Sequence, residues 1–224
     1  LRERIDREWR FENLIGSGTA MARVFETVRK VADTDITVLV RGESGTGKEL
    51  VARALHRLST RVDRPFVKVN CAALPSELLE SELFGFEKGA FTGAQRRKLG
   101  KFEYANHGTI FLDEISEMHS ALQAKLLQVL QDGECSRLGG ESDVHVDTRV
   151  IAATNRNLET AVVDGSFRED LFYRLNVVTV QLPPLRDRKD AIPLLVDHFL
   201  NMYNRQYGKS VKQLQSATLE AFHA

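Results

Sequence analysis

The segment Arg41-Gly42-Glu43-Ser44-Gly45-Thr46-Gly47-Lys48-Glu49 decides the fold of this chain. It follows an apolar, β-branched run at 36–40 and precedes a helical pattern at 49–56. Its glycines let a loop curl so that backbone N–H groups point inward at anionic oxygens, and the helix that follows adds the positive end of its dipole. Lys48 supplies a full charge for the outer phosphates. The segment therefore predicts a nucleotide phosphate loop rather than a glycine-rich turn without a ligand.

The residue after the lysine departs from the general phosphate-loop pattern. That pattern has Ser or Thr there as a magnesium ligand, whereas this chain has Glu49. Magnesium must be held differently, or the chain belongs to a narrower subclass of phosphate-loop proteins. The residues predicted to bind the nucleotide are Gly42, Glu43, Ser44, Gly45, Thr46, Gly47, Lys48 and Glu49.

Composition limits the class of protein. The 224 residues carry no net charge, and 42% are hydrophobic, which is enough for one large domain or a large one with a small one. Zero net charge argues against a surface that binds nucleic acid over its whole extent. No apolar run approaches the ~20 residues that span a bilayer, so we expect no membrane association. Cys71 and Cys135 are expected to be buried thiols in a reducing cytoplasm.

Apolar strands alternate with helical patterns along most of the chain. This alternation predicts an α/β fold with a five-stranded parallel sheet flanked by helices. Ser17 or Thr19 can cap the first helix, Pro75 can start another, and a further helix is expected over 121–130. The expected strands are 36–40, 66–70, 109–113, 149–154 and 177–181.

The pattern changes after Pro183 and Pro184, where no further strand is expected. A helical stripe contains Ile192, Leu195, Val196 and Phe199, and a second helix begins over 217–222. We therefore predict an upstream linker at 1–11, an α/β core at 12–184 and a partial helical lid at 185–224. The chain reads as a fragment of a longer protein.

Polar residues follow two of the expected strands. Asp113 can hold magnesium and Glu114 can orient an attacking water, because parallel sheets gather ligands at the carboxyl ends of their strands. A solvated acidic pair is the alternative interpretation. Asn155 can hydrogen-bond a γ-phosphate or the water, but a turn-forming Asn is the competing explanation and on its own would be the better one.

Two arginines, Arg168 and Arg174, lie six residues apart in the segment 167–175. Such residues often form surface ion pairs. In a phosphate-loop ATPase, an exposed arginine can instead reach the phosphate bound by a neighbouring subunit. The sequence leaves both interpretations open.

The segment 84–94 places Phe86 and Phe91 among glycines, between two expected helices. Aromatic side chains bury large areas at low entropic cost, so a partner surface is one natural destination for them. A loop folded back on its own core is the alternative.

With these motifs, the chain resembles the central AAA+ ATPase domain of bacterial enhancer-binding proteins, the activators of sigma-54 RNA polymerase. The most specific element is Gly89-Ala90-Phe91-Thr92-Gly93-Ala94. The phosphate loop with Glu49 is similar to that family's version, and 108–114 is similar to its Walker B segment. The resemblance covers nearly the whole chain.

The resemblance implies a catalytic centre for ATP and Mg²⁺. Lys48 would bind phosphate, Asp113 would serve the metal and Glu114 would activate water. Asn70 would hold Glu114 and couple the γ-phosphate to loop position, and Asn155 would sense that phosphate. These roles come from the family and not from spacing.

The resemblance also implies partners. Arg168 and Arg174 match candidate fingers that act in trans in a homo-oligomeric ring, a hexamer or heptamer. Residues 89–94 would contact sigma-54 within the RNA polymerase holoenzyme, and 137–140 match a second loop that moves with them. The bacterial cytoplasm is the expected location.

Some family parts lie outside these 224 residues. They are the second-sensor arginine, the regulatory domain and the domain that would bind promoter or enhancer DNA. Two other functions remain open: a generic AAA+ motor such as a clamp loader, helicase or unfoldase, and a scaffold that binds ATP without useful turnover. The hexapeptide argues against the first, and the Asp113–Glu114 pair against the second.

Overall fold

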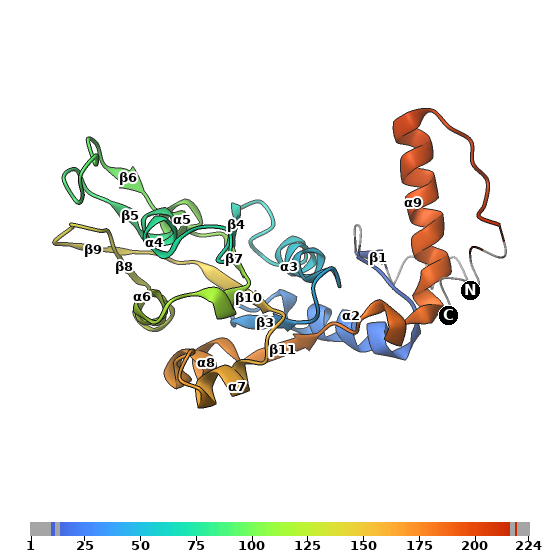
Figure 1. The fold of residues 1–224 in the computed structure, drawn as a ribbon, viewed down its shortest axis with the longest axis horizontal. Helices are drawn as coiled ribbons and strands as arrows, with labels where there is room; N and C mark the ends of the chain where they lie inside the picture. Colours follow the sequence, from blue (N-terminus) through green and yellow to red (C-terminus); the bar gives the residue numbers. More distant parts are fainter. Residues whose placement is uncertain (1–9, 12–13, 216–217, 219–224) are drawn as a thin grey trace.

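A computed structural model describes residues 10–11, 14–215 and 218 (Figure 1). Its centre is a five-stranded sheet in the order β11-β3-β10-β7-β4, with every neighbouring pair parallel. This arrangement confirms the predicted fold class. The strands are β3 (Val38–Arg41), β4 (Phe66–Asn70), β7 (Thr109–Asp113), β10 (Arg149–Thr154) and β11 (Val178–Gln181).

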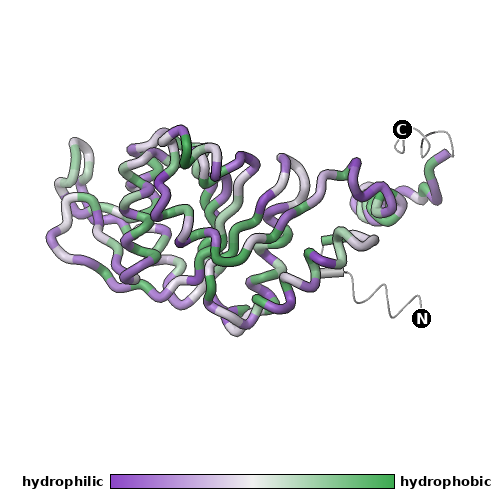
Figure 2. Tube along the Cα trace, turned by 90° about the horizontal axis from the view of Figure 1, so that it is seen from below, coloured by the Kyte–Doolittle hydropathy of each residue, from purple (hydrophilic) through white to green (hydrophobic). Residues whose placement is uncertain are grey.

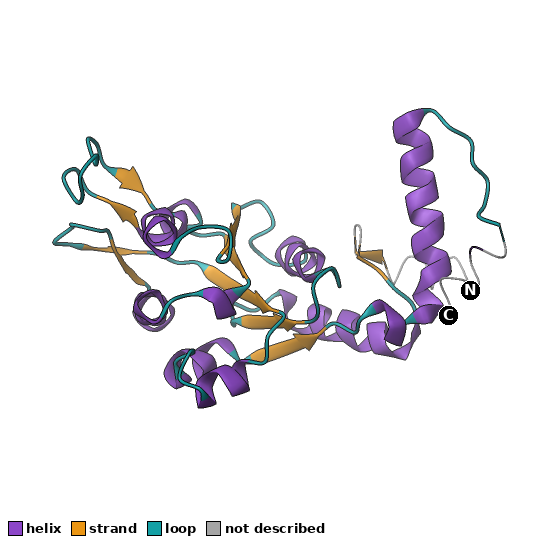
Figure 3. Cartoon of the chain, in the orientation of Figure 1, coloured by secondary structure: helices purple, strands orange, loops and turns teal. Residues whose placement is uncertain are grey.

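Helices cover both faces of the sheet (Figure 3), which is why its inner strands are apolar throughout. On one face, Val40, Phe111 and Ile151 pack against α2 (Gly18–Ala32) and α3 (Lys48–Arg57). On the other face, Leu39 and Ile110 belong to a second core. The helices of that second core are α4 (Ser76–Phe84), α5 (Lys101–Tyr104), α6 (Ser120–Asp132), α7 (Leu158–Val163) and α8 (Glu169–Leu175).

Two predicted helix starts need correction. Ser17 occupies the N-cap position of α2, but its hydroxyl makes no cap bond and instead donates to Asp190 Oδ2 at 3.3 Å. The reason is tertiary, because Asp190 reaches this helix start from the far end of the chain. Thr19 lies inside α2, and Pro75 precedes α4 rather than opening it.

Three short antiparallel strand pairs were not predicted from the sequence. β1 (Arg10–Phe11) pairs with β2 (Leu14–Ile15), so residues 10–11 of the predicted linker join the described fold. The other pairs are hairpins that lie side by side at one end of the molecule, joined by a bridge between Phe86 and Leu138 (Figure 1). They are β5 (Gly85–Phe86) with β6 (Lys98–Leu99), and β8 (Glu134–Ser136) with β9 (Asp143–His145).

The C-terminal part is helical, as expected. It contains two short 3₁₀ turns, η2 (Leu185–Asp187) and η3 (Lys189–Ala191), which lead into α9 (Ile192–Tyr207). A further 3₁₀ turn, η1 (Ile115–Glu117), follows β7 in the central part of the chain. α9 projects from the body at the end opposite the hairpins, and hydrophobic stretches concentrate in the body's middle (Figures 1 and 2).

Some predictions fall at the edges of the described chain. The predicted linker residues 1–9 lie outside the described residues, as does the second lid helix at 217–222 apart from Thr218. The division between core and lid stays a prediction. In the described part of the chain, no helix is long and apolar enough to cross a membrane.

Candidate functional site: a phosphate loop with a catalytic edge

The predicted phosphate loop links β3 to α3 in a tight curl. Gly45 and Gly47 have φ values of +80° and +101°, which side chains disfavour. A Cβ on Gly42 would lie 2.8 Å from Thr46 Oγ1 and 3.1 Å from the Leu182 carbonyl, so that position requires glycine. α3 begins at Lys48, so the positive end of its dipole faces the loop.

Lys48 is 7% exposed and extends back over the loop. Its ammonium donates to the carbonyls of Gly42 at 3.0 Å and Glu43 at 3.3 Å, and it lies 3.5 Å from Glu114 Oε1. A buried ammonium needs such partners. The lysine is therefore fixed between the loop and the end of β7.

Asp113 and Glu114 stand at the carboxyl end of β7, as predicted. Burial raises the pKa of Asp113, the charge of Glu114 raises it further, and Lys48 opposes both. Glu114 has φ +53°, and His107 is the other non-glycine residue with positive φ in the part of the chain described. This left-handed backbone turns the Glu114 carboxylate toward Lys48 and Asn155, whose N–H donates to Oε2 at 3.4 Å.

Asn70 lies opposite Asp113 in the register of β4 and β7. Its amide oxygen accepts the Ala72 N–H at 2.9 Å and closes a local turn. Among the described residues, no hydrogen bond joins Asn70 to Glu114, so the contact implied by the resemblance is not made in this structure. The role of Asn70 as a switch stays a prediction.

Glu49, the departure from the general pattern, is held by two cations. Arg53 donates to Oε1 at 2.7 and 2.9 Å, and Lys68 donates to Oε2 at 2.6 Å. The hydrogen bond from Lys68, more than that from Arg53, lowers the pKa of Glu49. Since both carboxylate oxygens are engaged, Glu49 braces α3 against β4.

The donors at this edge fit a magnesium ion bound together with phosphates. Within the described residues, no cluster of three or more His, Cys, Asp or Glu side chains could hold a metal. Mg²⁺ commonly uses one or two carboxylates and takes its other ligands from phosphates and water. Asp113 is the carboxylate in position for that role.

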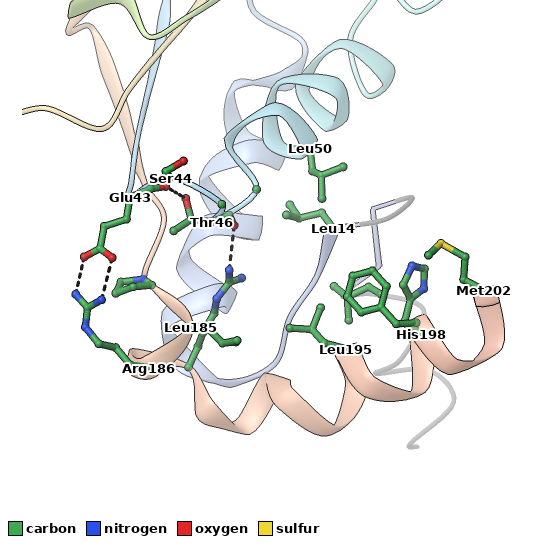
Figure 4. Close-up of a pocket in the computed structure, with 16 residues that line it drawn as sticks. Leu14, Glu43, Ser44, Thr46, Leu50, Leu185, Arg186, Leu195, His198 and Met202 are labelled. Atoms are coloured by element: carbon green, nitrogen blue, oxygen red, sulfur yellow. Dashed lines mark hydrogen bonds and ion pairs between the residues drawn. The ribbon is translucent and has the colours of Figure 1, made fainter. Parts of the chain in front are cut away.

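A cavity of about 600 Å³ adjoins the phosphate loop (Figure 4). Because it places a largely apolar lining beside a phosphate loop, it suits a nucleoside base. Its apolar lining comes from the start of the chain, from α3 and from α9, with Leu14, Ile15, Leu50, Leu195, Phe199 and Met202.

Two arginines at the base of the lid contact the phosphate loop itself. Arg188 is buried and donates to the Thr46 carbonyl at 2.9 Å, while Arg186 pairs with the Glu43 carboxylate at 2.8 and 2.5 Å (Figure 4). We did not expect these contacts. The only signal for them was a pair of arginines shortly after the Pro183–Pro184 boundary.

Arg168 and Arg174 lie at the two ends of α8. Arg168 pairs with Asp170 at 2.7 and 3.0 Å on the surface, and Arg174 donates to the Leu130 carbonyl at 2.7 and 3.0 Å. In the described structure, neither guanidinium contacts the phosphate loop of its own chain. Both guanidinium groups are engaged within their own chain in this structure, and their role at a neighbouring site stays a prediction.

The segment 89–94 forms the tip of the β5–β6 hairpin, away from the sheet (Figure 1). The Gly89 N–H donates to the Ala94 carbonyl at 2.8 Å and closes the tip. Phe91 is 47% exposed and rests edge-on against Phe86, with ring centroids 4.9 Å apart. The loop is thus folded on itself and not on the central core.

The second loop, 137–140, packs against this hairpin. Arg137 is nearly buried and binds Glu87 of the first hairpin at 2.8 Å and also Glu103 of α5 at 2.9 Å. The main chains of Glu87 and Leu138 are bonded at 3.0 Å. The two loops therefore form one unit.

Comparisons with known proteins agree with this geometry. A family model described as Sigma-54 interaction domain matches residues 14–181, and one described as AAA+ ATPase lid domain matches 186–224. The chain is 54% identical to the Nif-specific regulatory protein of Azotobacter vinelandii, covering 97% of this chain and 42% of that protein. It is also 54% identical to the DNA-binding transcriptional regulator NtrC of Klebsiella pneumoniae, covering 92% of this chain and 44% of that protein.

Solved structures give the same result. The structure of NtrX from Brucella abortus in complex with ATP has a TM-score of 0.85 and 41% identity, covering 96% of this chain and 46% of that one. The chain thus spans less than half the length of these relatives. The resemblance first drawn from 89–94 and the phosphate loop is confirmed, and the chain belongs to the family of Sigma-54 interaction domains, with the α/β core and lid of AAA+ proteins.

Proposed function

We propose that this domain binds ATP with Mg²⁺ and hydrolyses the γ-phosphate. One observation carries the proposal: Lys48 and Glu114 approach to 3.5 Å at the phosphate loop, next to the apolar cavity. The ATP-bound structure of NtrX supports nucleotide binding by this fold. The base would occupy the cavity and the phosphates would occupy the loop.

The chain's own groups then have distinct tasks. Phosphate oxygens would replace the carbonyls of Gly42 and Glu43 as partners of Lys48. Asp113 would hold Mg²⁺, which supplies charge neutralisation at the phosphates when it is bound. Loss of the Lys48 contact would free Glu114 to accept a proton from the attacking water. Asn155, whose N–H already lies 3.4 Å from Glu114, would sense the γ-phosphate.

We further propose that the site is completed by a second subunit. Arg168 or Arg174 of one chain would reach the γ-phosphate bound by the next chain in a homo-oligomeric ring of six or seven subunits. An arginine at that position stabilises the charge that develops during phosphoryl transfer. The exposed ion pair of Arg168 is easily exchanged for a phosphate because surface pairs are weak.

The output would be movement of the hairpin that carries Phe91. Nucleotide turnover would change the contacts of Glu114 and Asn70 and shift the population between raised and lowered hairpin positions. The raised tip, 89–94, would bind sigma-54 and help to convert a closed polymerase–promoter complex into an open one. The exposed aromatic ring at the tip supports this assignment.

A pair of variants tests this function. Phe91→Ala should weaken sigma-54 binding by at least about 30-fold, the value of a 2 kcal/mol hot spot, and leave ATP hydrolysis within about twofold. Lys48→Ala should abolish ATP binding. Tyr207→Ala is the matched control, because Tyr207 is an aromatic residue 63% exposed on the lid.

Two outcomes would contradict the proposal. Normal ATP affinity in Lys48→Ala would remove the phosphate-loop assignment. Unchanged sigma-54 affinity in Phe91→Ala, measured with an ATP analogue bound, would remove the tip as the contact and favour a generic AAA+ motor.

A further inference from the structure

We propose that Gln123 is a positioning residue for the arginine helix α8, linking it to the turn that follows Glu114. The inference rests on the proposed function, because it assumes that α8 supplies an arginine to a neighbouring site. It deepens that function by naming what holds the arginine helix in place.

Gln123 lies on α6 with none of its surface exposed. Its amide nitrogen donates to the Met118 carbonyl at 2.7 Å and to the Ser166 carbonyl at 3.0 Å. Its amide oxygen accepts the Arg168 N–H at 2.8 Å. Both donors and the acceptor are therefore used, and each bond goes to main chain.

These partners belong to two functional segments that are distant in sequence. Met118 ends the 3₁₀ turn η1, which starts one residue after Glu114. Ser166 and Arg168 form the entrance of α8, and Arg168 is its N-cap residue. One buried amide thus ties the catalytic edge of β7 to the helix that carries both arginines.

The opposite end of α8 is tied to the same helix. Arg174 donates twice to the carbonyl of Leu130, near the C-terminus of α6. Gln123 and Leu130 therefore hold the two ends of α8 from one rigid element. If the turn after Glu114 moved, α6 would move with it, and α6 would in turn shift α8 and its arginines.

Mixed assemblies separate a positioning role from a merely structural one. Lys48→Ala subunits have a dead site and intact arginines, and Arg168→Ala/Arg174→Ala subunits have an intact site and no arginines. Each alone should lack ATP hydrolysis, and their mixture should regain it. Failure to regain it would refute the trans-acting arginines, and hence the proposed function, before Gln123 is involved.

Gln123→Met removes all three hydrogen bonds at similar side-chain volume. It is introduced into the Lys48→Ala subunit in a first arm of the experiment, and into the subunit that lacks arginines in a second arm. In the Lys48→Ala subunit, it should reduce hydrolysis by the mixture at least tenfold, because that subunit supplies the arginine. In the subunit that lacks arginines, only the bond to the turn after Glu114 affects the active site, so the loss of hydrolysis should be clearly smaller than in the first arm. Equal losses in the two arms, a loss only in the second, or no loss in either would overturn the proposal.

Two further variants keep the test decisive. Gln131→Met is the matched control, since Gln131 is an exposed glutamine on the same helix, and it should change neither arm. Gln123→Glu retains an acceptor for the Arg168 N–H, so it should retain more activity in the first arm than Gln123→Met. If Gln123→Met fails to unfold cooperatively, Gln123→Glu replaces it in the same two arms, because it still lacks the two donors to Met118 and Ser166. It should then reduce hydrolysis more in the first arm than in the second, and equal losses, a loss only in the second arm, or no loss in either would overturn the proposal.

Discussion

The Asp113 carboxyl is placed where its charge is unfavourable in the absence of a cation. Burial is the main cause of its raised pKa, and the adjacent Glu114 adds to it. A bound magnesium ion would reverse this balance, because it is the largest positive charge that such a site can receive. Asp113 is therefore placed to bind a metal ion, and its charge destabilises the fold when no metal ion is bound.

Asp113→Asn should therefore raise the melting temperature of the nucleotide-free protein at pH 7. A raised carboxyl pKa means that ionisation disfavours the folded state, so this penalty is present above the folded-state pKa and shrinks as the pH falls through it. The gain in Tm should disappear toward pH 4. Thermal unfolding across that range, with Asp63→Asn as an exposed control, measures it. A Tm that falls at pH 7 would contradict the prediction.

Single residues also show how far the sequence could go. It predicted Lys48, Asp113, Glu114 and Asn155 as site residues, because strand ends of a parallel sheet share one edge. In the structure, Glu114 lies 3.5 Å from Lys48 and accepts the Asn155 N–H at 3.4 Å, and the catalytic roles stay a prediction. The sequence did not point to Gln123, because the hydrogen-bond partners of that side chain are main-chain groups of other segments. The order of side chains along the chain does not predict contacts with main-chain groups of other segments.

Among the helices and strands, too, some were predicted from the sequence and others were missed. Strands 66–70 and 109–113 were predicted to the residue, since each is a short run of mainly β-branched and aromatic residues that ends at a polar residue. The hairpins β5–β6 and β8–β9 were missed because strands of two or three residues have no detectable period. Their pairing depends on tertiary contacts such as those of Arg137 with Glu87 and Glu103.

The contact between the two hairpins yields a prediction about Gly139. It has φ +68°, and an added Cβ would lie 2.8 Å from Ala90 Cβ and 2.9 Å from Ala90 Cα. Gly139→Ala should therefore destabilise the fold by about 1–2 kcal/mol of backbone strain plus about 1–3 kcal/mol of overpacking. It should also push the tip outward and speed tryptic cleavage after the exposed Lys88.

Gly165→Ala is the matched control for that substitution. Gly165 has φ +77°, but its added Cβ would meet nothing within 4 Å. Gly165→Ala should lose only the free energy of unfolding that comes from backbone strain, about 1–2 kcal/mol, and should leave cleavage after Lys88 unchanged. Equal unfolding free energies for the two variants, measured in urea, would show that the hairpins do not press on each other at this point.

The arrangement of the chain separates its proposed tasks. The hairpin tips lie at one end and the lid helix α9 at the other, with the phosphate loop between them (Figure 1). Signals from the nucleotide must then travel through packed elements such as α6. Sequence patterns gave the order of these parts, but not their joining at Arg137, Gln123 and Arg188, which depends on the assembled fold.

A final prediction concerns the assembled protein. If Arg168 or Arg174 acts on a neighbour, ATP hydrolysis per subunit should rise with protein concentration and level off once the oligomer is complete. Loss of the trans-acting arginine should lower the turnover at that plateau by about 10³-fold, because such arginines contribute 10³–10⁵ elsewhere. Arg205→Ala, at an exposed position of α9, is the control. Turnover per subunit that stays constant while sedimentation shows the oligomer forming would mean that each chain completes its own site, and the subunit seam would then have no part in the chemistry.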